Sequence, residues 1–207
     1  MLQELIDLTG TEEYEDNGGL ITRGMTVSGS DTEILLNVKT GCDDETQLWK
    51  VVCFGVREQS LGLEWNDFFE LKRDHVLLWP HIQNNYSLWF NGPKRVAATI
   101  VGQLWQRHFE LVANWFPFQR FINQAHQLTN FVGDCYGLLA NGPESLILAY
   151  KQIMDEHGYK TSVISHKPKF WDGEKFIPPG ELVAFLMGQS YVVAASIEAH
   201  RIEDVAC

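Results

Sequence analysis

One short stretch of this chain occurs twice, fifty positions apart. Residues 86–93 read Tyr-Ser-Leu-Trp-Phe-Asn-Gly-Pro and residues 136–143 read Tyr-Gly-Leu-Leu-Ala-Asn-Gly-Pro, so five of the eight positions are identical. In each copy apolar residues lead into Asn-Gly-Pro, and apolar residues at helical spacing follow. Proline suits the first turn of a helix because its missing N–H has no partner there and its φ is already helical. The sequence therefore predicts a strand–turn–helix unit that is used twice.

Two long helices are expected after these copies. The first starts near Pro93 and stops before Pro117, because a residue that precedes proline is pushed out of the helical region. Its apolar stripe includes His108 and predicts that Trp105 and Trp115 pack in the core. The second runs from Pro143 to Gly158. Duplication and convergence both explain the repeat, and the choice between them stays open.

The residues before the first copy favour strands. Residues 2–8 form a short amphipathic piece, and the acidic residues 10–19 are expected to be a loop. Runs rich in β-branched and aromatic residues then predict strands over 20–27, 32–39 and 47–56, the last two joined as a hairpin, and further extended segments over 61–71 and 75–79.

The rest of the chain mixes both patterns. The sequence predicts a short helix over 124–132, a strand over 159–165, a hairpin around Asp172-Gly173, a helix from 180 to about 187 and a final strand over 191–199. We therefore expect an α+β fold, with a mainly antiparallel β lobe over 1–85 and an α/β lobe over 86–207. Because no long linker separates the lobes, one continuous globular unit is expected.

Composition narrows the classes of function. The net charge is −11 and no run of lysine or arginine exists, which argues against nucleic-acid binding and anionic membranes and favours a basic partner. No apolar run approaches the ~20 residues of a membrane span. The four cysteines are scattered, and the first residues lack the pattern of a secretory signal, so we expect a cytoplasmic protein without a disulfide framework.

The two Asn-Gly-Pro segments are candidate anion sites, because a helix N-terminus offers unpaired N–H groups and a partial positive charge. The predicted ligand residues are Asn91, Gly92, Arg95, Asn141 and Gly142. Against this hypothesis, neither segment is a phosphate-binding loop, and Glu144 would repel an anion. A turn that is merely tight is the alternative interpretation.

Exposed aromatic residues are the other candidate feature. Trp79 lies before Pro80 and Trp171 lies beside Asp172-Gly173, so both sit near element ends where they can anchor a partner or ligand. The leading hypothesis is a soluble, non-catalytic binding or accessory protein that recognises a protein partner through an acidic, aromatic-bearing surface. The alternative is an enzyme or sensor that binds a small anion at paired helix N-termini.

No familiar catalytic or metal motif is present. The sequence lacks the serine-hydrolase elbow and the HExxH zinc motif, and its cysteines lack zinc spacing. His75 and His81 lie six residues apart, too far to share a metal on one strand, although a haem or metal role for either remains a weaker alternative. Cys135 could form a catalytic pair with a histidine only if the fold brings the two side chains together. We expect no cofactor and no metal, and whether the protein is catalytic stays open.

Overall fold

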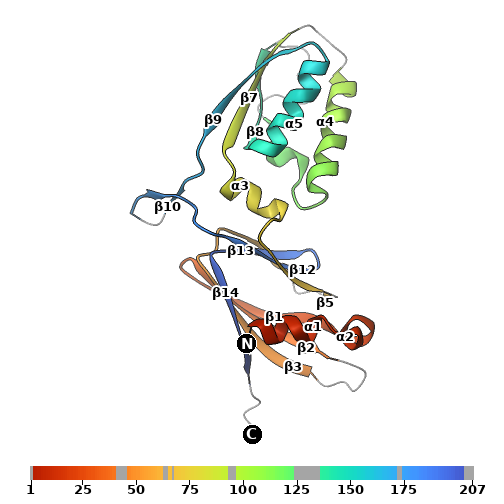
Figure 1. The fold of residues 1–207 in the computed structure, drawn as a ribbon, viewed down its shortest axis with the longest axis vertical. Coiled ribbons are helices and arrows are strands. Elements are labelled where there is room, and N and C mark those ends of the chain that lie inside the picture. The colour runs from red at the N-terminus through yellow and green to blue at the C-terminus, as the bar shows by residue number, and fades with distance from the viewer. Residues whose placement is uncertain are drawn as a thin grey trace. The chain divides into compact units, whose positions relative to one another are not determined.

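The computed structural model describes residues 2–40, 46–62, 65–66, 68–92, 97–123, 136–171 and 174–202 (Figure 1). The fold is mixed α+β, and every strand pair in these ranges is antiparallel. The chain divides into two compact units. Unit 1 comprises Met1–Leu78 and Gly180–Cys207, and unit 2 comprises Trp79–Pro179.

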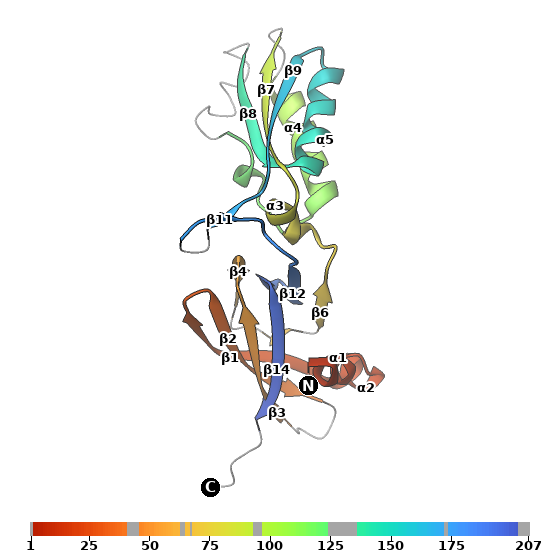
Figure 2. The same cartoon turned by 60° about the vertical axis from the view of Figure 1, so that its left-hand side comes forward.

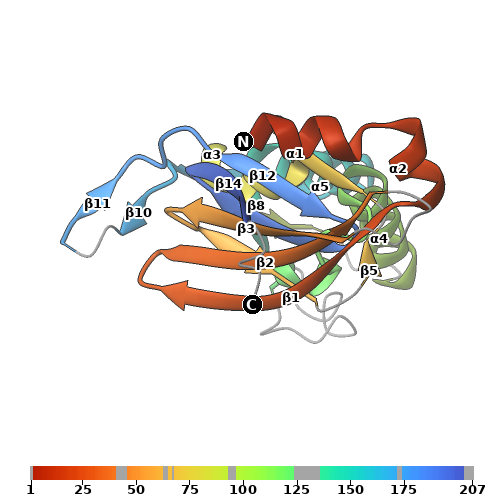
Figure 3. The same cartoon turned by 90° about the horizontal axis from the view of Figure 1, so that it is seen from below.

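Unit 1 contains two antiparallel sheets (Figure 3). The first has the order β14-β3-β2-β1-β5, with β1 Gly19–Ser28, β2 Asp31–Lys39, β3 Thr46–Phe54, β5 Trp65–Asn66 and β14 Ser196–Ile202. The second has the order β4-β13-β12-β6, with β4 Glu58–Ser60, β6 Phe69–Lys72, β12 Val183–Met187 and β13 Ser190–Ala194. The predicted strands over 20–27, 32–39 and 47–56 are confirmed as β1, β2 and β3.

The boundary of the units differs from the sequence-based division at residue 85. That division places residues 180–207 in the C-terminal lobe, whereas β14 pairs with β3 from Ser196↔Phe54 to Ile202↔Leu48. One buried cluster joins both sheets of unit 1 to its helices α1 (Leu2–Thr9) and α2 (Glu12–Asn17). Its largest members include Trp49, Phe185 and Tyr14. β12, β13 and β14, near the end of the chain, therefore complete the core that the first strands of the chain begin.

The expected loop over 10–19 is wrong, because it contains α2. Thr11 caps this helix: its Oγ1 accepts the N–H of Tyr14 at 3.2 Å. Glu12, Glu13 and Glu15 stand in the first turn, where the helix dipole favours negative charge. Tyr14 is buried, so one aromatic side chain holds this otherwise polar helix on the core.

Two further expectations are corrected in unit 1. The predicted helix over 180–187 is strand β12, whose five residues are all buried, and a short apolar run buried on both faces has no period that separates helix from strand. The single strand expected over 191–199 is two strands, β13 and β14, which separate at the exposed Ala195.

The extended segment expected over 75–79 is helical. It forms the 3₁₀ turn η1 (Val76–Leu78) and then α3 (Trp79–Ile82). His75 supports the turn, since its Nδ1 accepts the N–H of Leu77 at 3.3 Å. Pro80 occupies the first turn of α3, where proline is tolerated.

Unit 2 is built on a three-stranded sheet with the order β8-β7-β9. Its strands are β7 Asn85–Asn91, β8 Tyr136–Pro143 and β9 Lys160–His166, and helices α4 (Ala97–Val112) and α5 (Glu144–Glu156) cover one face (Figures 1 and 2). The 3₁₀ turn η2 (Phe118–Arg120) follows α4. A small ribbon of β10 (Phe170–Trp171) and β11 (Phe176–Ile177) follows β9, which confirms the predicted hairpin.

The helix-covered face is the core of unit 2. Leu88 and Phe90 of β7 are buried there, and the buried row of α4 is Ile100, Leu104, His108 and Val112. Trp105 is 55% exposed and stacks on Phe109 at 5.9 Å, so the expectation that it packs in the core is wrong. The apolar stripe in the sequence is wider than the row of residues that α4 buries. The buried row follows the i+4 spacing.

His108 joins three segments of this core. Its Nδ1 lies 2.8 Å from the Tyr150 hydroxyl of α5, and its Nε2 lies 2.7 Å from the carbonyl oxygen of Phe116. A carbonyl oxygen only accepts, so Nε2 carries the proton and Nδ1 accepts the Tyr150 hydroxyl. Burial lowers the pKa of His108, and the bond to Phe116 opposes this shift. The imidazole is therefore a neutral, satisfied core group.

Pro143 is the cap residue before α5 rather than its first helical residue, with φ −64° and ψ 145°. β8 extends through Asn141, Gly142 and Pro143, so these residues end a strand and do not form a separate turn. Residues 93–96, which include Pro93 and Arg95, lie outside the described residues, as do 124–135 with the expected short helix and Cys135.

Candidate functional site

The sheet of unit 2 has a second face, which no helix or strand of the described ranges covers (Figures 1 and 2). Cross-strand partners point to the same side of a sheet. Trp89 pairs with Leu138 and Ser162, and Asn91 pairs with Tyr136 and Lys160. We call this side the open face; it comprises Asn85, Ser87, Trp89, Asn91, Tyr136, Leu138, Asn141, Pro143, Lys160, Ser162, Ile164 and His166.

Large apolar side chains stand exposed on the open face. Trp89 is 42% exposed, Ile164 51% and Tyr136 71%. The strand pattern explains their placement, because Leu88 and Phe90 face the helices and the residue between them must point the other way. The alternation of side chains over residues 88–90 is a sequence signal that could have placed Trp89 on this face. No local signal identified Tyr136, Lys160 or Ile164, because their grouping depends on which strands pair.

An open groove lies on this face at the end where β7 finishes. It has a volume of about 360 Å³ and is lined by Trp89, Phe90, Asn91, Tyr136, Gly137, Lys160, Thr161 and Ser162. Trp89 and Tyr136 supply aromatic surface, and Asn91, Lys160 and Ser162 supply polar groups. The lining contains one ammonium and no carboxylate, so the groove suits a ligand that combines an apolar or planar part with negative charge.

Charge is distributed unevenly between the units. Unit 1 has seven lysine and arginine residues against twenty aspartate and glutamate residues, a net charge of −13. Unit 2 has nine against seven, a net charge of +2. On the open face the charged or titratable side chains are Lys160, His166 and Tyr136, and none is a carboxyl group. The acidity expected of the whole surface therefore does not extend to the candidate residues of unit 2.

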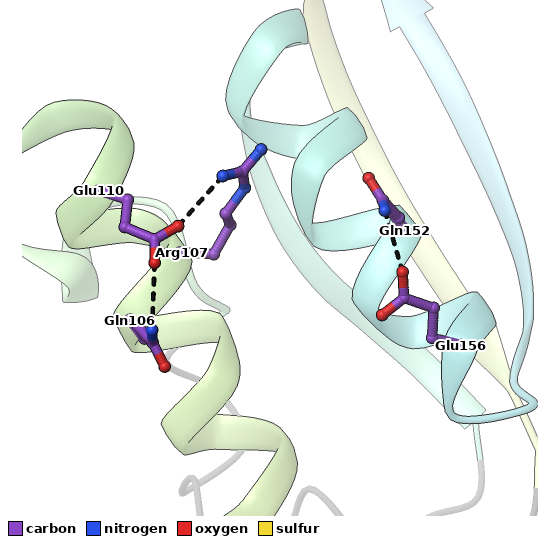
Figure 4. Close-up of polar contacts among 5 residues, drawn as sticks. All are labelled: Gln106, Arg107, Glu110, Gln152 and Glu156. Carbon is purple, nitrogen blue, oxygen red and sulfur yellow. Dashed lines mark hydrogen bonds and ion pairs between the residues drawn. The ribbon is translucent and has the colours of Figure 1, made fainter.

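The outer surface of the two helices is different in kind (Figure 4). On α4 the Glu110 carboxylate accepts hydrogen bonds from Gln106 and Arg107, each at 3.1 Å. On α5 Gln152 donates to Glu156 at 2.9 Å. Pairs at such spacing are typical of a solvated helix surface. The outer helix surface therefore carries satisfied polar pairs, and α4 also exposes the stacked rings of Trp105 and Phe109.

The predicted anion residues do not come together. β7 and β8 are antiparallel, so Asn91 and Gly92 lie at one end of the pair, while Gly142 lies opposite Tyr86 at the other. Six residues separate Tyr86 from Gly92, which is roughly 20 Å of strand. Asn91 lines the groove and Asn141 lies on the open face toward its far end. This topology therefore does not bring two helix N-termini together in one site.

The start of α5 is also occupied by the chain itself. The N–H of Glu144 donates to the Asn84 carbonyl and that of Ser145 donates to Gln83 Oε1, both at 2.9 Å. The Glu144 carboxylate accepts from Asn84 Nδ2 at 3.2 Å and from the Tyr86 hydroxyl at 3.0 Å. These contacts satisfy the first donors of the helix and add a negative charge beside them. Arg95 and the start of the other helix lie outside the described residues.

The glycines of both segments have a packing role. A Cβ on Gly92 would lie 2.7 Å from Cδ1 of Tyr159, and a Cβ on Gly142 would lie 2.7 Å from Cδ1 of Phe121. Neither glycine has a positive φ. Each therefore admits an aromatic ring against the end of a strand, which favours the structural interpretation of these residues.

The two tryptophans proposed as anchors lie away from the groove lining. Trp79 is half-buried on α3, which packs against β8. Trp171 is 51% exposed on the ribbon and meets Phe176 edge to face at 5.1 Å. The structure thus assigns these two residues to different elements, and Asn91 is the predicted residue that lines the groove.

The remaining candidate groups show no reactive arrangement in the described ranges. Burial raises the pKa of Cys53 to about 12, so this thiol stays protonated. Nδ1 of His75 already accepts a backbone N–H, and burial lowers its pKa. No three histidine, cysteine, aspartate or glutamate side chains of these ranges gather as metal ligands. No helix among them is long and apolar enough to cross a membrane.

Comparison with known proteins adds no relative: no family model matches the chain, and no curated protein or solved structure matches it.

Proposed function

We propose that this protein is a soluble, cytosolic, non-catalytic binding protein that recognises a protein partner through the open face of unit 2. One observation carries the proposal: Trp89, Tyr136 and Ile164 are exposed together on a sheet face that no described helix or strand covers. Exposed apolar patches with a polar surround mark interaction surfaces, and aromatic residues are the commonest anchors of binding energy.

The charge of this face supports a partner with acidic groups. Total charge alone favoured a basic partner, and that preference still applies to unit 1, which holds the excess of carboxylates. Lys160 lies beside Asn91 on the edge strand β9, and no carboxylate shares the face. An acidic partner surface would gain attraction there, and a basic one would meet repulsion.

The repeated sequence fits the same proposal. We propose that β7–α4 and β8–α5 are two copies of one strand–helix unit. Support comes from the shared Asn-Gly-Pro segment and from a long helix after each strand, both helices lying on the same side of the sheet (Figure 2). Two copies that send their helices to one side leave the other side available for a partner.

The groove favours a second candidate, a small anionic ligand with a planar part. Its volume of about 360 Å³ falls in the usual range of ligand sites, and Lys160 lies among its aromatic walls. A thermal-shift screen with nucleotides, phosphates and aromatic carboxylates tests this candidate. Stabilisation that is lost in Lys160→Ala would support it, and an unchanged melting temperature with every compound would exclude it.

The leading proposal is tested by partner capture with matched variants. The partner is captured from the native lysate, identified, purified and titrated against three proteins: wild type, Trp89→Ala/Tyr136→Ala, and Trp105→Ala/Phe109→Ala. The last pair removes equally exposed rings from α4. We expect the open-face variant to bind at least ~10-fold more weakly, since anchor truncation typically costs over 1.4 kcal/mol. Equal affinity of the wild type and the open-face variant would refute the proposal.

A further inference from the structure

The two edges of the unit 2 sheet are treated differently by the chain. Along β8, the register breaks near Leu139, Ile122 forms a bridge to Ala140, and the N–H of Asn141 donates to the Phe121 carbonyl at 2.9 Å. A bulge and a covering segment are ordinary means of protecting an edge strand. The β8 edge is therefore closed to further pairing over these residues.

Among the described residues, the opposite edge strand, β9, has neither a bulge nor a covering segment. Its seven residues pair with β7 in unbroken register from Lys160↔Asn91 to His166↔Asn85. It contains no proline, and no strand in the described ranges lies on its outer side. Alternate N–H and C=O groups of an edge strand point outward, where they can pair with another extended chain. The groove reaches this strand, since Lys160, Thr161 and Ser162 are among its lining residues.

We propose that the partner binds by adding an acidic, extended segment to β9 as a fourth strand of the sheet. This inference rests on the proposed function and specifies how the open face is used. Main-chain hydrogen bonds to β9 would hold the segment, and every second side chain of the segment would continue the open face. The added strand would lie beside Lys160, Ser162, Ile164 and His166, which are all exposed.

These four side chains determine the preferred chemistry of the segment. Lys160 and His166 stand at the two ends of β9. In either direction of pairing, one acidic end of the added strand would face the Lys160 ammonium and the other would face the His166 imidazole, which can donate a hydrogen bond. Ser162 and Ile164 lie between them and suit small or β-branched residues. The expected segment is thus a β-prone stretch of about seven residues with acidic ends.

A second copy of this chain is a poor occupant. A closed dimer would pair β9 with itself antiparallel about Val163, which places Lys160 opposite His166 of the other copy. This self-pairing would place no carboxylate opposite Lys160, whereas an acidic segment would. Charge therefore selects a different, acidic chain.

Synthetic peptides test this pairing directly. The probe is a capped seven-residue peptide of alternating valine and threonine with glutamate at each end, and its counterpart carries lysine at each end. We expect the glutamate peptide to bind more tightly by a few-fold, and Lys160→Glu to reverse the preference. Binding should slow hydrogen exchange of amides within 160–166, measured by NMR, while amides of α4 and α5 keep their rates.

Backbone methylation separates strand addition from simple side-chain attraction. A strand uses alternate N–H groups toward one neighbour, so N-methylation of one set of alternate residues in the glutamate peptide should abolish binding and the other set should spare it. Equal effects of the two sets, or no slowing of exchange in β9, would overturn the strand addition. If strand addition fails but Trp89→Ala/Tyr136→Ala still weakens binding of the purified partner, the proposed function remains supported. If this variant also binds the partner as the wild type does, both the strand addition and the proposed function are refuted.

Discussion

At the scale of single residues, Gly92 illustrates a position that the backbone packing fixes. Its missing Cβ leaves room for Tyr159, whose Cα would lie 3.0 Å from the added methyl, so the contact involves backbone that cannot easily move. We expect Gly92→Ala to lower the free energy of unfolding by about 1–3 kcal/mol in urea titrations. Gly102 of α4 has open space around it, and Gly102→Ala should instead stabilise by up to about 1 kcal/mol. Equal effects of the two variants would contradict this packing.

His108 gives unit 2 a dependence on pH. Burial lowers its pKa below the ordinary 6.5, so the unfolded chain binds a proton more readily than the folded one. Its contribution to stability is complete above pH 6.5 and is lost as the pH falls below that value. We expect the melting temperature to drop between pH 7.5 and pH 5, and His108→Gln to reduce that drop.

A residual slope in His108→Gln is expected from His75, whose pKa burial also lowers. The same drop in wild type and His108→Gln would show that another group dominates.

At the scale of elements, α2 depends on its cap. Thr11 Oγ1 accepts the N–H of Tyr14 and donates to the Leu8 carbonyl at 3.1 Å, which links α2 to α1. We expect Thr11→Ala to lower the free energy of unfolding by about 1 kcal/mol, as measured by urea denaturation. Thr11→Ser keeps the hydroxyl and should lose only a small part of that stability. A serine variant as unstable as the alanine variant would exclude the hydroxyl as the cause.

The elements also show what sequence patterns can and cannot predict. Alternating strands such as β2 follow directly from the chain, because one face is buried and the other is not. β12 is buried on both faces and has no alternation, so its sequence does not distinguish strand from helix. Thr11 is a residue type that commonly caps a helix, but the acidic residues around it favoured a loop. Anchoring by Tyr14 alone is a tertiary effect.

At the scale of the whole molecule, long-range pairing decides which residues belong together. β14 completes the sheet of unit 1 beside β3, although about 140 residues separate them in the chain. No local pattern encodes that pairing, nor the antiparallel order that separates the two Asn-Gly-Pro segments. The same pairing groups Trp89, Tyr136 and Lys160 on one face, so the candidate site could be predicted from sequence only through Asn91.

A buried charge in β14 tests the membership of this strand. Ala199 is buried opposite Val51, so Ala199→Asp would place a carboxylate in the core of unit 1 and destabilise it by about 3 kcal/mol. Hydrogen exchange should quicken first in residues 46–54, which form β3, the strand beside β14. Selective quickening in 136–166 would support the division at residue 85 instead.

The most direct measurement of how this protein acts is hydrogen exchange of the chain alone and in complex with its captured and purified partner. We predict slower exchange in 85–91 and 160–166, the central strand and the available edge of the open face, with little change in α4 and α5. Slower exchange confined to the acidic unit 1, or to the outer helices of unit 2, would contradict recognition through the open face.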